Sequence, residues 1–127
     1  MKKSRVSRSV SALDVAAYIQ ANHLNHGPIE AWKMHKLLYY CQKHSIEFEG
    51  VPMFSEQIRH TSRGVIIKEL CVQHFNNLYV GGSTIGNLNH LSLRQVDTIA
   101  YVIENYGKLT LVELDHKIQN EMQEAIF

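Results

Sequence analysis

Apolar residues recur at helical spacing along most of the chain, which predicts a mainly α-helical fold. The first helix should begin at Ser11, whose hydroxyl can cap it, with Asp14 in the first turn where the helix dipole favours an acid. Gly27-Pro28 is a breaker, so this helix should end before it. Its predicted apolar face consists of Leu13, Ala16, Ala17 and Ile19.

A second, longer helix is expected to be central to the fold. It should start near Ile29, just after Pro28, and run to about Phe48, because Gly50 and Pro52 break the pattern. Such a run exceeds the mean helix length. Its predicted buried stripe consists of Trp32, Leu37, Leu38, Cys41 and Ile46.

Residues 50–63 lack a helical period, and a loop or short β-hairpin is expected there. Ser62 is then expected to cap a third helix running from Gly64 to about Phe75. The predicted inward-facing residues of that helix are Val65, Ile66, Leu70 and Cys71. The stretch from Asn76 to Asn89 is rich in Gly and Asn, which predicts a long irregular connection.

Two further helices are predicted, each by a capping box: Ser92 with Gln95, and Thr110 with Glu113. Gly107 is expected to end the first of them in a left-handed conformation. The predicted buried residues are Leu93, Val96, Ile99, Ala100 and Ile103 in one helix and Leu111, Leu114 and Ile118 in the other. The expected fold class is mainly α, a compact bundle of about five helices with a short irregular or β-hairpin segment near residues 50–63.

Composition adds limits to this fold. The 127 residues fit one domain, expected over residues 11–127, and 45% apolar with 20% charged residues is an ordinary globular composition. No apolar run approaches the ~18 residues of a membrane span, and no apolar segment follows the basic N-terminus as a secretory signal requires. A cytoplasmic protein with no membrane partner is therefore expected.

The basic charge is concentrated at the N-terminus. Residues 1–10 hold Lys2, Lys3, Arg5 and Arg8 and no acid, whereas the remaining residues hold nine basic and twelve acidic side chains. This Ser-rich tail is expected to be disordered in the isolated protein. Its four cations could contact nucleic-acid phosphates without sequence specificity, so a small DNA-binding regulator is an alternative function.

No residue pattern predicts an enzyme or a cofactor. Cys41 and Cys71 belong to no CxxC unit and lie among apolar neighbours, so two buried free thiols are expected. His23 and His26 could reach one metal from a single turn, but no HExxH motif or acid at ligand spacing accompanies them. His44 follows Cys41 by three residues and is expected to point off the apolar stripe, which disfavours a nucleophile–base pair. A hydrolase using a histidine site is the enzymatic alternative.

Five segments form a series that matches a known pattern: Asp14–Ile19 (DVAAYI), Lys33–Gln42 (KMHKLLYYCQ), Gly50–Ile58 (GVPMFSEQI), Gly64–Ile66 with Leu70, and Ile103–Gly107 (IENYG). In order and spacing they resemble the Panacea family, also called SocA-like antitoxin domains and found in phage-associated proteins. The KLLYY block is the most distinctive segment. The chain departs from the family pattern at His60-Thr61, at Val65 and after His116.

The resemblance implies an antitoxin or adaptor to which no catalytic residue is attributed. Such domains neutralise a co-encoded toxin by direct protein contact, and the toxins include translation inhibitors related to alarmone synthetases. One branch is a proteolytic adaptor that delivers its toxin to a protease, and this is a second alternative function. The expected partner is a cognate protein toxin, with a homo-oligomer left open.

The KLLYY block also predicts a surface anchor. Tyr39 and Tyr40 lie about 100° apart on a helix, so they cannot both point to one side. One should pack inward with its hydroxyl at the rim. The other, flanked by Lys36 and Lys43, would suit an interface. For Tyr40, core and interface are both open.

A cationic cluster follows the block. Arg59, His60 and Arg63 form either a solvated loop or a contact patch for an acidic toxin surface or a substrate-phosphate mimic. The predicted partner-binding residues are Tyr40, Glu56, Arg59, His60, Arg63 and Lys68, and the predicted nucleic-acid-binding residues are Lys2, Lys3, Arg5 and Arg8.

Overall fold

The computed structural model describes residues 10–23, 29–74, 79–80 and 86–126. Over these residues the protein is mainly α-helical, with five α-helices, one 3-10 helix and two small antiparallel sheets of two strands each. The predicted fold class is therefore confirmed. None of the described helices is both long and apolar enough to cross a membrane.

Helix α1, Ala12–Asn22, begins with the predicted cap. The backbone N–H of Asp14 donates to the Ser11 hydroxyl at 3.1 Å, and the Ser11 N–H donates to the Asp14 carboxylate at 3.0 Å. The buried residues of the helix are Ala12, Asp14, Val15, Ala16 and Ile19. Leu13 and Ala17 are only half-buried, so the predicted face was partly wrong.

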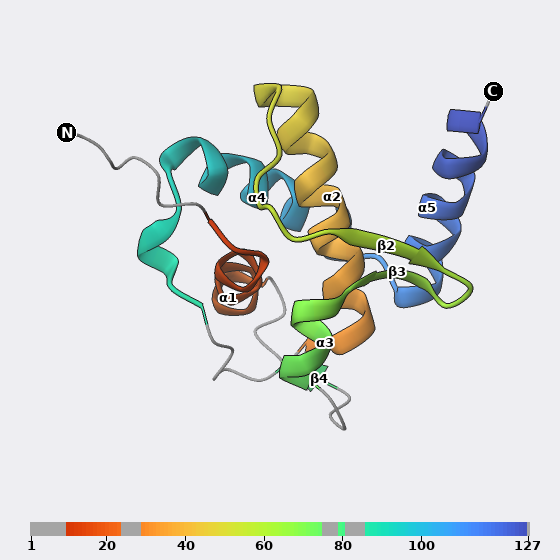
Figure 1. The fold of residues 1–127 in the computed structure, drawn as a ribbon, viewed down its shortest axis with the longest axis horizontal. Coiled ribbons are helices and arrows are strands. Elements are labelled where there is room, and N and C mark those ends of the chain that lie inside the picture. The colour runs from red at the N-terminus through yellow and green to blue at the C-terminus, as the bar shows by residue number, and fades with distance from the viewer. Residues whose placement is uncertain (1–9, 24–28, 75–78, 81–85, 127) are drawn as a thin grey trace.

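Helix α2, Ala31–Glu49, runs through the middle of the fold and contacts α1, α4, α5 and β3 (Figure 1). The short strand β1, Ile29–Glu30, precedes it where helix was predicted. Gly50 ends α2 at a φ of 77° and donates its N–H to the Ile46 carbonyl oxygen at 2.9 Å. Leu37, Leu38 and Cys41 are fully buried as predicted. Trp32 and Ile46 are 40% and 51% exposed, although Ala31 and Ser45 beside them are buried, because they lie on parts of the helix surface that the core does not cover.

A β-hairpin replaces the predicted start of the third helix. Strand β2, Ile58–Thr61, pairs antiparallel with β3, Gly64–Ile67, and α3 covers only Lys68–His74. Ser62 and Arg63 form the turn, so Ser62 is not a helix cap. The reason is local: Gly64 has a φ of 105°, outside the helical region, and the β-branched run that follows it favours a strand.

The predicted irregular connection is described only in part, by strand β4 (Tyr79–Val80), which pairs with β1, and by residues 86–89; the rest of it lies outside the described residues. The 3-10 helix η2, Leu88–His90, lies against α1. Asp14 joins the two, because its carboxylate accepts from the Asn87 N–H at 2.7 Å and from His90 Nδ1 at 3.0 Å. Burial alone would raise the pKa of Asp14, but these bonds and that from Ser11 lower it below its ordinary value.

Helix α4, Leu93–Tyr106, has the predicted capping box of Ser92 and Gln95. Its buried residues are Thr98, Ile99, Val102, Ile103 and Tyr106. Leu93 is 84% exposed and Ala100 is also exposed, so the predicted face was wrong at both positions.

Gly107 follows α4 with a φ of −63°, which is right-handed, so the predicted left-handed cap was wrong. The Gly107 carbonyl oxygen instead accepts a hydrogen bond from Lys33 Nζ at 2.7 Å. A side chain at this position would collide with the Ile103 carbonyl oxygen. Close packing, rather than a left-handed turn, therefore accounts for the glycine.

Helix α5, Leu111–Ile126, has the second predicted capping box, with the Glu113 N–H donating to Thr110 Oγ1 at 3.1 Å and the Thr110 N–H to the Glu113 carboxylate at 2.8 Å. Leu114 and Ile118 are buried as predicted, and Leu111 is half-buried. The helix runs in roughly the same direction as α2 (Figure 1). Two hollows lie along the surface between these helices, one lined in part by strand β2 and the other by Arg63 of the hairpin turn.

Candidate functional site

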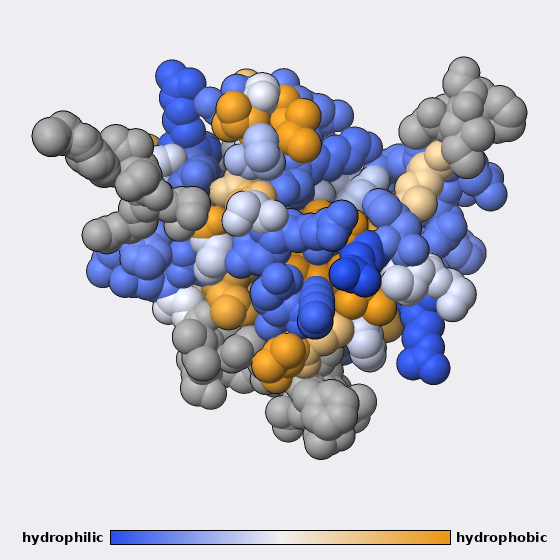
Figure 2. Space-filling model, viewed as in Figure 1, coloured by the Kyte–Doolittle hydropathy of each residue, from blue (hydrophilic) through white to orange (hydrophobic). Residues whose placement is uncertain are grey.

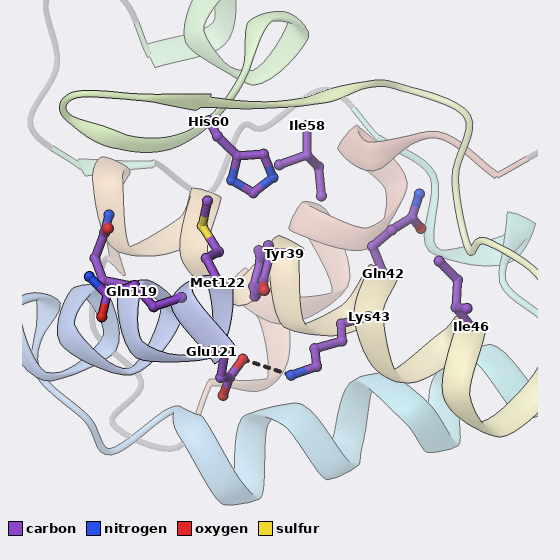
Figure 3. Close-up of a pocket in the computed structure, with 10 residues that line it drawn as sticks. Tyr39, Gln42, Lys43, Ile46, Ile58, His60, Gln119, Glu121 and Met122 are labelled. Atoms are coloured by element: carbon purple, nitrogen blue, oxygen red, sulfur yellow. Dashed lines mark hydrogen bonds and ion pairs between the residues drawn. The ribbon is translucent and has the colours of Figure 1, made fainter. Parts of the chain in front are cut away.

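The larger hollow, the α2–α5 groove, has a volume of about 630 Å³ and lies between α2, the β2–β3 hairpin and α5. Ile58 and His60 reach into it from the hairpin, and Met122 reaches in from α5 (Figure 3). The groove is lined by Tyr39, Gln42, Lys43, Ile46, Ile58, His60, Gln119, Glu121, Met122 and Gln123. Its walls are mainly apolar, with polar groups at a few places, which is the usual composition of a binding site.

An ion pair closes one side of the groove. Lys43 Nζ lies 2.7 Å from a Glu121 carboxylate oxygen (Figure 3). The other Glu121 oxygen accepts from the Tyr40 hydroxyl at 3.1 Å. Burial lowers the pKa of Lys43, but the hydrogen bond and charge of Glu121 outweigh it and raise the pKa. The three groups satisfy one another, so the groove carries little net charge here.

Tyr40 does not form part of the protein surface. Its side chain is fully buried, and its ring stacks on Tyr106 with 3.9 Å between centroids. The proposal of Tyr40 as an exposed anchor is therefore corrected: it belongs to the core, with its hydroxyl at the edge of the groove. Tyr39 is the half-buried member of the pair, and its ring meets His60 edge-on at 6.2 Å.

The smaller hollow, the Trp32 pocket, has a volume of about 380 Å³ and is lined by Trp32, Lys36, Arg63, Leu111, Val112, Asp115 and His116. Lys36 is 4% exposed and its Nζ lies 3.0 Å from an Asp115 carboxylate oxygen. Gly64 packs so closely on this ion pair that a Cβ there would lie 2.6 Å from Lys36 Nζ. The glycine thus lets the hairpin turn approach the pocket, with Arg63 at its edge.

The remaining predicted site residues divide into three groups. Glu56 is structural, because its carboxylate accepts from the Ala12 N–H at 2.9 Å at the start of α1. Arg59 and Lys68 are exposed and line neither hollow. Lys2, Lys3, Arg5 and Arg8 lie outside the described residues, so the nucleic-acid contact through them stays a prediction.

Gln42, the last residue of the motif segment Lys33–Gln42, has a structural role. Its side-chain oxygen accepts from the backbone N–H groups of Met53 and Phe54 at 2.8 and 3.1 Å, and its Nε2 donates to the Phe54 carbonyl oxygen at 2.8 Å. Ser45 adds a bond from its hydroxyl to the Val51 carbonyl oxygen. These bonds tie the segment after α2 back onto the helix.

Cys71 lies beside a histidine that does not activate it. His35 Nδ1 accepts from the Ile67 N–H at 3.0 Å, so in the neutral ring the proton is on Nε2, which faces Cys71 Sγ at 3.8 Å. A ring nitrogen that already carries a proton cannot take one from the thiol. Burial raises the pKa of Cys71, which further disfavours the thiolate.

Cys41 and His44 are both buried, and the contacts that the structure shows for His44 are structural. Both cysteines are free thiols; Cys41 is fully buried, whereas Cys71 is only partly buried. His44 is buried too, which corrects the expectation that it points off the stripe. Its Nδ1 lies 2.6 Å from a Glu47 carboxylate oxygen and its Nε2 lies 2.8 Å from the Tyr106 hydroxyl. Burial raises the pKa of Tyr106 to about 12, so its hydroxyl stays protonated at neutral pH.

The described part of the chain contains no group of three or more His, Cys, Asp or Glu residues that could hold a metal ion. His23 is buried and its Nε2 lies 3.4 Å from the Gly107 carbonyl oxygen. His26, the other half of the predicted pair, lies outside the described residues.

Comparisons of the chain with protein-family models, with curated proteins and with solved structures found no match in any of the three. The resemblance to the Panacea family therefore depends on the motif residues alone and stays a prediction.

Sequence reasoning missed apolar residues at the surface, exposed or half-buried, that shape both hollows. Trp32 and Ile46 were assigned to the core by their helical spacing, and Met122 and Val112 were not considered. Apolar surface gathers over the C-terminal end of α2 and just beyond it (Figure 2), where Ile46 and Phe48 on the helix and Val51 after it are each about half exposed. Periodicity alone could not identify them, because it cannot tell which parts of a helix surface the neighbouring elements cover.

Proposed function

We propose that this protein is an antitoxin-like binding domain that neutralises a partner protein by direct contact at the α2–α5 groove. The observation that carries the proposal is the groove itself: an open, largely apolar hollow with exposed Ile46 at its edge. Apolar surface left exposed in such a hollow is typical of a protein–protein contact. The motif resemblance supports a toxin as the partner.

The state of the chemical groups supports binding over catalysis. The two buried histidines of α2 are already engaged: His35 accepts from the Ile67 N–H, and His44 lies within hydrogen-bond distance of Glu47 and of the Tyr106 hydroxyl. The groove offers shape, apolar contact and a few hydrogen-bonding groups instead. Such a surface suits an apolar segment of another protein, held by Tyr39, Ile58 and Met122.

The test pairs two apolar-to-acidic substitutions, I46E and L93E. Both residues are exposed on helices, but only Ile46 lines the groove; Leu93 is 84% exposed on α4. The product of the adjacent gene is expressed alone, with the wild-type chain, and with each variant. We expect the product to be toxic alone and silenced by the wild-type chain and by L93E.

The I46E variant should weaken the purified complex by roughly tenfold or more and reduce the rescue, because a charge would be placed against the apolar contact. Circular dichroism checks that both variants stay folded. If the partner binds I46E as tightly as it binds the wild type, the groove is not part of the interface. A harmless neighbouring product that forms no complex would refute the antitoxin proposal itself.

A further inference from the structure

The Trp32 pocket combines an ordered aromatic wall with apolar surface open to solvent. The Trp32 ring stacks on the ring of buried His35, with 5.3 Å between centroids and 25° between planes, yet 40% of the residue stays exposed. Val112, across the pocket on α5, is 64% exposed. Rigid aromatic and aliphatic walls of this kind lose little conformational entropy when a side chain binds between them.

The charge at the pocket is not balanced. At the inner side Lys36 and Asp115 neutralise each other at 3.0 Å. Arg63, at the hairpin turn, is exposed, and its guanidinium forms no ion pair with any residue that the structure describes. The mouth of the pocket therefore presents one uncompensated cation beside two apolar walls.

We propose that the Trp32 pocket binds a peptide segment in which a carboxylate side chain lies next to a bulky apolar one. The carboxylate pairs with the Arg63 guanidinium, whose fork of donors matches two carboxylate oxygens. The apolar side chain lies between Trp32 and Val112. This deepens the proposed function, since the segment would belong to the partner protein, at a second contact beside the α2–α5 groove.

A carboxylate suits the pocket better than a phosphate. Asp115 is 40% exposed in its side chain and lines the same hollow as Arg63. A doubly charged phosphate would place more negative charge near that carboxylate, and Arg63 is the only unpaired Lys or Arg among the described residues that line the pocket. A single negative charge with an apolar neighbour matches Arg63 and the walls formed by Trp32 and Val112.

The chain has a single tryptophan, so its fluorescence reports directly on this pocket. The full chain is titrated at low salt with acetyl-Leu-Glu-Leu-amide and with the uncharged acetyl-Leu-Gln-Leu-amide. We expect the Glu peptide to bind about fivefold more tightly, the size of effect that an exposed ion pair supports. The advantage should shrink as salt screens the pair. Equal binding of the two peptides, or no change in Trp32 fluorescence, would overturn the proposal.

Two matched hairpin variants, R63Q and R59Q, locate the effect. Both arginines are exposed, but Arg59 lines neither hollow. R63Q should abolish the preference for Glu over Gln, and R59Q should keep it; loss in both variants would mean general charge attraction and would overturn the site. Gel filtration tests whether a second copy of the chain occupies the pocket. If the wild-type chain is a dimer and R63Q is a monomer, the occupant is a second copy of the chain and the proposed peptide ligand is wrong.

The peptide result is independent of the proposed function. If the chain prefers the Glu peptide but the product of the adjacent gene is neither toxic nor bound by the chain, the pocket proposal is supported and the antitoxin proposal is refuted. A neutralised toxin, with no preference of the chain for the Glu peptide over the Gln peptide, would support the antitoxin proposal and refute the pocket proposal.

Discussion

Lys36 and Arg63 line one pocket, but they belong to regions of opposite character. Lys36 lies on α2, is 4% exposed and is paired with Asp115 at 3.0 Å. Arg63 lies on the hairpin turn, is exposed, and has no acidic partner among the described residues. The two cations differ in whether the fold supplies an acidic partner: Lys36 has one and Arg63 has none among the described residues.

The same contrast separates the helical framework as a whole from the hairpin. On the framework the polar groups of Asp14, Gln42 and His44 each bond to groups of the chain. On the hairpin Arg59 and Arg63 stay in solvent. A buried polar group needs a partner from the same fold, whereas an exposed one is available to another molecule. Asp14, Gln42 and His44 therefore maintain the structure, whereas the charged groups of the hairpin are available for recognition.

The largest expected effect comes from the core side of α2. Leu38 is fully buried, whereas Ile46 on the same helix is 51% exposed. L38A should lower the free energy of unfolding by about 2–5 kcal/mol, because it removes buried contacts and leaves a cavity. I46A should cost roughly 0.5 kcal/mol or less. Urea unfolding measures both, and similar losses would contradict the division of α2 into a core and an exposed end.

Gly64 joins the two regions, and its replacement should have the next largest effect. G64A would require a φ near 105° and would bring a Cβ within 2.6 Å of Lys36 Nζ. G50A is the matched control, since Gly50 also has a positive φ but has open space around it. We expect about 1 kcal/mol for G50A and about 2–3 kcal/mol for G64A. Equal losses would mean that the hairpin does not depend on close approach to the ion pair.

Asp14 tests the framework through pH. Its pKa is lowered in the folded protein, so the folded state favours the carboxylate and gains stability from it above the unfolded pKa of about 3.8. That contribution should be lost as the pH falls through the lowered folded pKa. D14N should therefore cost about 1–2 kcal/mol at neutral pH, and the difference from the wild type should shrink in acid. A pH-independent difference in thermal unfolding would contradict this account.

The smallest expected effects are on the hairpin. R63Q and R59Q should each change the free energy of unfolding by about 0.5 kcal/mol or less, because neither side chain has a described partner to lose. Thermal unfolding checks this. A marked loss for R63Q alone would show that Arg63 belongs to the framework after all.

Several features of the fold could be predicted because their signals are local. The three capping pairs at Ser11, Ser92 and Thr110 each lie within one turn, and all three form. A short hairpin was among the expectations for residues 50–63, but its second strand, Gly64–Ile67, was assigned to the third helix. Ser62 was interpreted as a cap, although the β-branched run after Gly64 carried the opposite signal. Of the predicted binding residues, His60 and Arg63 line the hollows, while Tyr40 and Glu56 are structural.

The sequence by itself determined the helical class, the starts of three helices and the stop at Gly50, because each depends on neighbours a few residues away. The tertiary structure alone decided that Tyr40 is buried, that Trp32 is exposed, and that Lys33 bonds to the Gly107 carbonyl oxygen. Such features depend on parts of the chain that are distant in sequence, as the bonds of Tyr40 with Glu121 and of Lys33 with Gly107 illustrate. Burial is a property of the assembled elements, and no local pattern contains it.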